Sequence, residues 1–116
     1  MCTLPPQSWI QEIQAAPNGV AIQEDIVRQD GSEIVRSVRA RFDGADYPVE
    51  GANAVDTMAY TRTDRHSICA IGRKDGKVSV TETVLANPEE QTLTIIYNYV
   101  LGENNVAHGV AVFQAA

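Results

Sequence analysis

Apolar and polar residues alternate along most of this chain, and turn residues interrupt the alternation roughly every ten to thirteen positions. A period of two is typical of a β-strand with one buried and one solvent-facing side. The run from Asp56 to Leu101 contains four such segments in succession. The pattern predicts strands over Ser8–Gln14, Val20–Gln29, Glu33–Phe42, Ala45–Val49, Asp56–Thr63, His66–Lys74, Lys77–Ala86, Thr92–Leu101 and Val106–Gln114.

Short linkers between these strands predict an antiparallel meander. Asn18-Gly19, Asp30-Gly31 and Asp75-Gly76 supply the positive φ angles that tight hairpins need. A meander of this length hides its edges by closing on itself. Since no 3.6-residue apolar stripe with a cap is present, we expect little helix. The predicted fold is therefore all-β, an up-and-down barrel of about eight or nine strands. One domain spans 1–116, with 1–6 as a flexible lead-in.

Turn lengths predict which residues face each other. A three-residue loop around Gly31 places Ile26 opposite Arg36 and makes Glu24 a diagonal neighbour of Arg36. The strand after Asp43-Gly44 places Val49 opposite Val38. In the second half, two-residue loops at 64–65 and 75–76 and four-residue loops at 87–90 and 102–105 fix the remaining registers. The expected facing pairs are Tyr60 with Cys69, Cys69 with Glu82, Glu82 with Ile95, and Ile95 with Val112.

This register defines a predicted inward face, because the opposite face of the same strands is rich in threonine and reads as solvent-facing. The inward residues of the second half are Met58, Tyr60, Arg62, Ser67, Cys69, Ile71, Val78, Val80, Glu82, Val84, Leu93, Ile95, Tyr97, Tyr99, His108, Val110 and Val112.

Several of these inward residues are charged or polar, which is unusual for a filled core. A buried charge without a partner is strongly unfavourable, so each must be paired or hydrated. One explanation is structural: Glu82 pairs with Arg62, and Glu24 with Arg36. The other is a solvated cavity whose polar groups orient a small ligand. The candidate ligand-binding residues are Tyr60, Arg62, Glu82, Tyr97, Tyr99 and His108.

Composition narrows the classes of partner. The chain has 116 residues, 44% of them hydrophobic, a net charge of −6 and no cluster of Lys or Arg. A nucleic-acid or anionic-membrane surface needs clustered positive charge, so neither is expected. No apolar run approaches the length of a membrane span, and the N-terminal residues lack the pattern of a secretory signal. We therefore expect a cytoplasmic location.

Candidate chemistry is sparse. Cys2 and Cys69 are too few for a disulfide framework, and His66 and His108 have no Cys or His neighbour at ligand spacing. The sequence predicts no metal site, no cofactor and no catalytic residue, because no nucleophile–base–orienter set is visible. Of three functional hypotheses, the least favoured is a small enzyme that uses His108 or Glu82 as a general base.

The segment Arg41–Val49 (RFDGADYPV) is the most distinctive in the chain. With Asp56-Thr57, residues 74–78 (KDGKV), 91–94 (QTLT) and 109–113 (GVAVF), it resembles a group of largely uncharacterised bacterial lipocalin-like proteins over roughly residues 40–114. The resemblance implies a calycin-type barrel, akin to lipocalins and fatty-acid-binding proteins. It implies no catalytic residue.

One departure from that group concerns the first strand. Such proteins begin with a G-x-W strand, and this chain has no such motif before Pro5; Trp9 lies in the next strand. The barrel is then shorter by a strand, open on one side, or completed by a second copy of the chain. An exposed edge favours self-association, so a homodimer is expected.

Two functional hypotheses lead. The first is a non-enzymatic protein that holds a small, mainly apolar molecule in the barrel interior. The second is a structural or interaction module with a filled core, which acts through dimerisation or an exposed strand edge. The volume of the interior separates them.

Overall fold

The fold is described here from a computed structural model, which describes residues 8–16, 18–51, 55–102 and 105–114. These residues form no helix, and so none that is long and apolar enough to cross a membrane. They form nine strands: β1 (Ser8–Ala16), β2 (Gly19–Val27), β3 (Glu33–Arg41), β4 (Tyr47–Glu50), β5 (Thr57–Asp64), β6 (Ser67–Lys74), β7 (Lys77–Asn87), β8 (Thr92–Gly102) and β9 (Asn105–Gln114).

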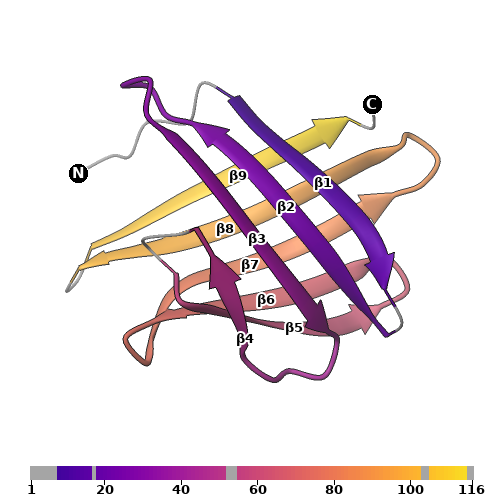
Figure 1. Ribbon diagram of the computed structural model, residues 1–116. Helices are drawn as coiled ribbons and strands as arrows, with labels where there is room; N and C mark the ends of the chain where they lie inside the picture. The colour runs from indigo at the N-terminus through magenta and orange to yellow at the C-terminus, as the bar shows by residue number, and fades with distance from the viewer. Residues whose placement is uncertain (1–7, 17, 52–54, 103–104, 115–116) are drawn as a thin grey trace.

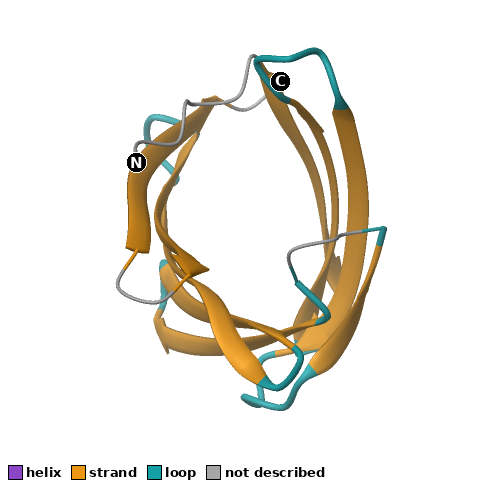
Figure 2. Ribbon diagram, turned by 90° about the vertical axis from the view of Figure 1, so that its left-hand side faces the viewer, coloured by secondary structure: helices purple, strands orange, loops and turns teal. Residues whose placement is uncertain are grey.

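The nine strands form one antiparallel meander in the order of the chain, from β1 to β9. Figure 1 shows β1, β2 and β3 crossing in front of β6–β9, with the short β4 linking the two groups. Figure 2 shows that the sheet curls into a flattened half-barrel. The predicted all-β meander is therefore confirmed. Among the described residues, β1 pairs only with β2 and β9 only with β8, so both strands have a free edge.

The turns at Asn18, Gly31 and Asp75-Gly76 contain the positive φ angles that their residues predicted. Asn18 lies between β1 and β2 with φ 55°, and Gly31 lies between β2 and β3 with φ 85°. Asp75 and Gly76 have φ 52° and 79°, the two positive values of a type I′ hairpin. These conformations suit Asn, Asp and Gly, which tolerate the left-handed region.

The predicted inward face of β6 is wrong. Tyr60 pairs with Ala70 rather than Cys69, so Ala70 and not Cys69 shares the inner face of the sheet. The turn is one residue later than expected because the Asp64 carboxylate accepts the backbone N–H of His66, at 2.8 Å. A bulge between Arg62 and Asp64 then changes the alignment again, and the net slip of one residue turns the strand over.

The predicted inward face of β9 is wrong for the same kind of reason. The expected pairing holds at Gly102 and Asn105, but a bulge between Val100 and Gly102 shifts the rest of the ladder. Ile95 then faces Ala111 instead of Val112. His108, Val110 and Val112 therefore lie on the outer face of the sheet.

Other registers moved by two residues and kept their faces. Ile26 faces Ile34 rather than Arg36, because five residues rather than three connect β2 to β3. Glu24 is now directly opposite Arg36. Glu82 faces Tyr97 rather than Ile95. The predicted pairing of Val38 with Val49 is confirmed.

The core lies between the two groups of strands, where Ala40, Met58, Tyr60, Ala70 and Val80 are buried together. Val55, in the connection before β5, is 1% exposed and belongs to the same cluster. Ile22, Val38 and Tyr99 pack against it from either side. Burial of this apolar surface is the main stabilising contribution to the fold.

Gly72 provides a test of this packing. A Cβ at Gly72 would overlap the Val80 Cγ1 and Met58 Sδ atoms inside the core. Gly72→Ala is therefore expected to lower the free energy of unfolding by about 1–3 kcal/mol, measured by urea denaturation. Gly76→Asn is the control: nothing lies within 4 Å of its added Cβ, and Asn tolerates the positive φ. Equal stability of Gly72→Ala and the wild type would contradict the packing described for this core.

Candidate functional site

Four of the six predicted site residues face the interior. Tyr60, Glu82 and Tyr97 lie in one row across the sheet, with Ala70 between Tyr60 and Glu82. Tyr99 lies one inward position further along β8, and its ring is 5.5 Å from that of Tyr97. The sequence pattern therefore located one wall of the interior correctly. Ligand binding by these residues stays a prediction.

Arg62 and His108 lie elsewhere. Arg62 is exposed near the end of β5, where its guanidinium lies 5.8 Å from the Phe42 ring centroid and donates to the Arg65 carbonyl. The predicted Glu82–Arg62 ion pair is therefore not formed. His108 is exposed on the outer face, where its Nδ1 hydrogen bonds with the Asn98 Oδ1.

The predicted Glu24–Arg36 ion pair is present and lies inside the barrel. Arg36 Nε is 2.9 Å from Glu24 Oε1, and both side chains are largely buried. The other carboxylate oxygen, Oε2, accepts hydrogen bonds from Trp9 Nε1 and from Gln11 Nε2, the latter at 2.8 Å. The charge on Glu24 is thus stabilised by one cation and two neutral donors.

Glu82 is the second interior carboxyl, and its surroundings are different. Burial and, to a smaller extent, the charge of Glu24 raise its pKa to about 7, against the opposing effect of Arg36. No described residue donates a hydrogen bond to it. Among the described residues, the cation that acts on Glu82 is Arg36, which is already paired with Glu24. Glu82 therefore gains or loses its proton near neutral pH.

Two of the three interior tyrosines, Tyr60 and Tyr99, respond to the same environment. Burial raises the pKa of Tyr60, and the charges of Glu82 and Glu24 add to this effect. Burial also raises the pKa of Tyr99, although Arg36 beside it acts in the opposite direction. Both hydroxyls therefore stay neutral at physiological pH.

The space beside Glu82 is small. A cavity of about 20 Å³ is lined by Glu24, Arg36, Tyr60 and Glu82, together with apolar core residues. Such a volume has room for a single water molecule, whereas ligand pockets measure roughly 300–1,000 Å³. The interior ligand predicted from the sequence would therefore require the two groups of strands to move apart.

An aromatic contact closes the seam between the two edge strands. The Trp9 ring of β1 lies 5.1 Å from Phe113 of β9 and 5.8 Å from Tyr97 of β8, both in edge-to-face geometry. Tyr97 in turn covers Gly109, where any side chain would collide with its ring. Between β1 and β9, side-chain contacts thus replace the backbone ladder that holds every other neighbouring pair of described strands.

The free edge at β9 has no charged residue. Residues 105–114 contain no Asp, Glu, Lys, Arg or Pro, although edge strands in natural proteins are usually protected by such residues. On its outer face, Val110 and Val112 are 64% and 65% exposed. Ile96 pairs directly with Val110, so the exposed apolar surface continues onto β8. Exposed apolar patches of this kind mark interaction surfaces.

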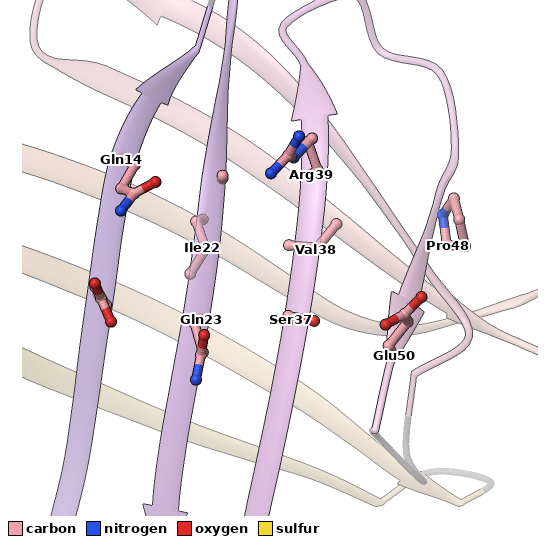
Figure 3. A pocket seen from close by; sticks show the side chains of 10 residues that line it. Gln14, Ile22, Gln23, Ser37, Val38, Arg39, Pro48 and Glu50 are labelled. Atoms are coloured by element: carbon pink, nitrogen blue, oxygen red, sulfur yellow. The ribbon is translucent and has the colours of Figure 1, made fainter.

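A shallow groove of about 390 Å³ lies on the outer face of β1–β4 (Figure 3). Its side chains are mainly polar, with Gln14 and Gln23 on one side and Arg39 and Glu50 on the other (Figure 3). It shares Ile22, Ser37 and Val38 with the wall of the small interior cavity and contains none of the predicted site residues.

Sequence reasoning missed the role of β1 in the interior. Trp9 and Gln11 share the phase of Ile13, but the alternation of residues 8–14 is weak because Ile10 and Ile13 point in opposite directions. A usable signal was the presence of a tryptophan and a glutamine in a strand that pairs with the Glu24 strand. Buried Trp N–H groups usually find an acceptor.

Comparison with known proteins adds no identification: no family model, curated protein or solved structure matches the chain. The lipocalin-like resemblance stays a prediction. Within the described ranges, no group of three or more His, Cys, Asp or Glu side chains is placed to hold a metal ion.

Proposed function

We propose that this protein is an interaction module that self-associates through β9. The supporting observation is the combination found at that strand: a free edge without any charged residue, beside an exposed apolar outer face. Every second residue of such an edge presents an unpaired N–H and C=O to the solvent. Another strand can satisfy these groups by continuing the sheet.

A second copy of β9 fits this edge better than a charged strand would, because β9 itself carries no charged residue. Antiparallel pairing of two β9 strands about Gly109 or Val110 places no charged side chain opposite another, and it joins the exposed valines of both copies on one face. The other free edge is less suitable. A centred antiparallel pairing of two β1 strands would set Glu12 against its own copy, which is destabilising.

The interior ligand is the second candidate, and it is supported by the polar groups that surround the small cavity. Native mass spectrometry of the freshly purified protein reads both proposals together, since it reports the number of subunits and any retained small molecule.

Sedimentation velocity over a concentration series tests the self-association. We expect the wild type to reach about twice the chain mass of 12.6 kDa, and Val110→Lys to remain a monomer, because two lysines would meet near the symmetry axis. Val35→Lys is the matched control, since Val35 is 47% exposed on the outer face of β3, and it should still dimerise. A monomeric wild type, or a dimeric Val110→Lys variant, would overturn the proposal.

A further inference from the structure

The interior joins two groups of strands that share few backbone hydrogen bonds. The β3–β4 ladder and the β4–β5 ladder each contain two facing pairs. On the other side, β1 and β9 are connected by the Trp9 ring contacts, with no ladder between them in the described part of the chain. The seam between β1 and β9 is therefore the weakest boundary of the half-barrel.

Glu82 is linked to this seam through Glu24, which lines the same small cavity and accepts the Trp9 indole N–H. The residue that faces Glu82 on β8 is Tyr97, and the Tyr97 ring contacts Trp9. Trp9 in turn donates its indole N–H to Glu24. A continuous chain of contacts thus leads from Glu82 through Tyr97 and Trp9 to the interior ion pair.

The charges around Glu82 come from both groups of strands. Glu24 on β2 and Arg36 on β3 act on it from the opposite group of strands. Tyr60 on β5 and Tyr99 on β8 lie near it on its own side of the interior. Neither tyrosine carries a charge near neutral pH, and Arg36 is held by Glu24 at 2.9 Å. When Glu82 loses its proton, the interior gains a second carboxylate without a second cation.

An ionised carboxylate in this position needs water. The cavity beside it holds about 20 Å³, enough for a single molecule, whereas a buried anion without partners is strongly destabilised. Water can reach Glu82 most easily where no backbone hydrogen bonds have to break, which is the seam closed by Trp9.

We propose that deprotonation of Glu82 above neutral pH opens the seam between β1 and β9 and admits solvent to the interior. Protonated Glu82 keeps the seam closed. The opened form exposes the aromatic row of Trp9, Tyr97 and Phe113 and enlarges the interior, which is the state that a small apolar molecule could enter. This inference does not rest on self-association through β9.

The single tryptophan of the chain reports this opening directly. We expect the Trp9 fluorescence emission to shift to longer wavelength as the pH rises through neutrality, while far-UV circular dichroism keeps its β signal. Glu82→Gln, which cannot ionise, should show no shift. Glu12→Gln removes an exposed carboxylate from the same strand as Trp9 and should behave like the wild type.

Hydrogen exchange of the wild type gives an independent reading if Glu82→Gln fails to fold. Amides of β1 should lose protection above neutral pH beyond the intrinsic rise in exchange rate, and amides of β6 should not. Unchanged Trp9 emission in the wild type, the same shift in Glu82→Gln, or uniform loss of protection in β1 and β6 would overturn the inference.

Discussion

Replacing Arg36 with leucine is expected to lower the free energy of unfolding by about 3 kcal/mol, because Glu24 would remain largely buried without its cation. Trp9 and Gln11 would still donate to Glu24, but two neutral donors do not balance a full charge in the interior. Urea denaturation at neutral pH measures the loss.

Two further variants separate this charge effect from a simple change of shape. Glu24→Gln combined with Arg36→Leu removes both charges and keeps an acceptor for Trp9, so most of the stability should return. Arg73→Leu breaks the exposed Arg73–Asp46 pair instead, and should change the free energy of unfolding by less than about 1 kcal/mol. Similar losses for Arg36→Leu and Arg73→Leu would contradict a buried pair.

Glu82→Gln is expected to stabilise the protein at alkaline pH and to change little in acid. The pKa of Glu82 is raised to about 7 in the folded protein, from an ordinary value of 4.5. Below the lower value, both the folded and the unfolded chain bind the proton. Between the two values only the folded chain keeps it, so the stability of the wild type falls as the pH rises through this window. Above the higher value no further loss occurs.

The gain from Glu82→Gln at about pH 8.5 should be roughly 2–3 kcal/mol, measured by urea denaturation against the wild type. The variant and the wild type should be nearly equal at about pH 4. Glu12→Gln, at an exposed position, is the control and should show neither effect. A gain of equal size at both pH values would point to altered packing rather than to the proton on Glu82.

The positions of the strands and turns could be predicted because they depend on local chemistry. Alternation located the strands, and the conformations of Asn18, Gly31 and Gly76 follow from residue types that tolerate positive φ. The faces of β6 and β9 could not be predicted, because each depends on a bulge that changes the register by one residue. The residue types near Arg62 and Val100 do not predict such a bulge.

The same difference explains the outcome for the candidate site. Tyr60 and Glu82 stayed on the predicted inner face because the register slipped by one residue between β5 and β6 and again by one, at a bulge between Gly72 and Arg73, between β6 and β7, so the two slips cancel. Tyr97 stayed there because the β7–β8 register moved by two residues. His108 moved outward with the whole of β9. The contacts of Glu24 with Trp9 and Gln11 depend on how β1 curls toward β9, which is a property of the complete sheet.

Amide hydrogen exchange along β9 tests the central functional claim most directly. If two copies join through this strand, the alternate β9 amides that do not bond to β8 should be protected in the wild type, increasingly so at higher protein concentration, and should exchange rapidly in Val110→Lys. Rapid exchange of those amides in the wild type at every concentration would contradict self-association through β9.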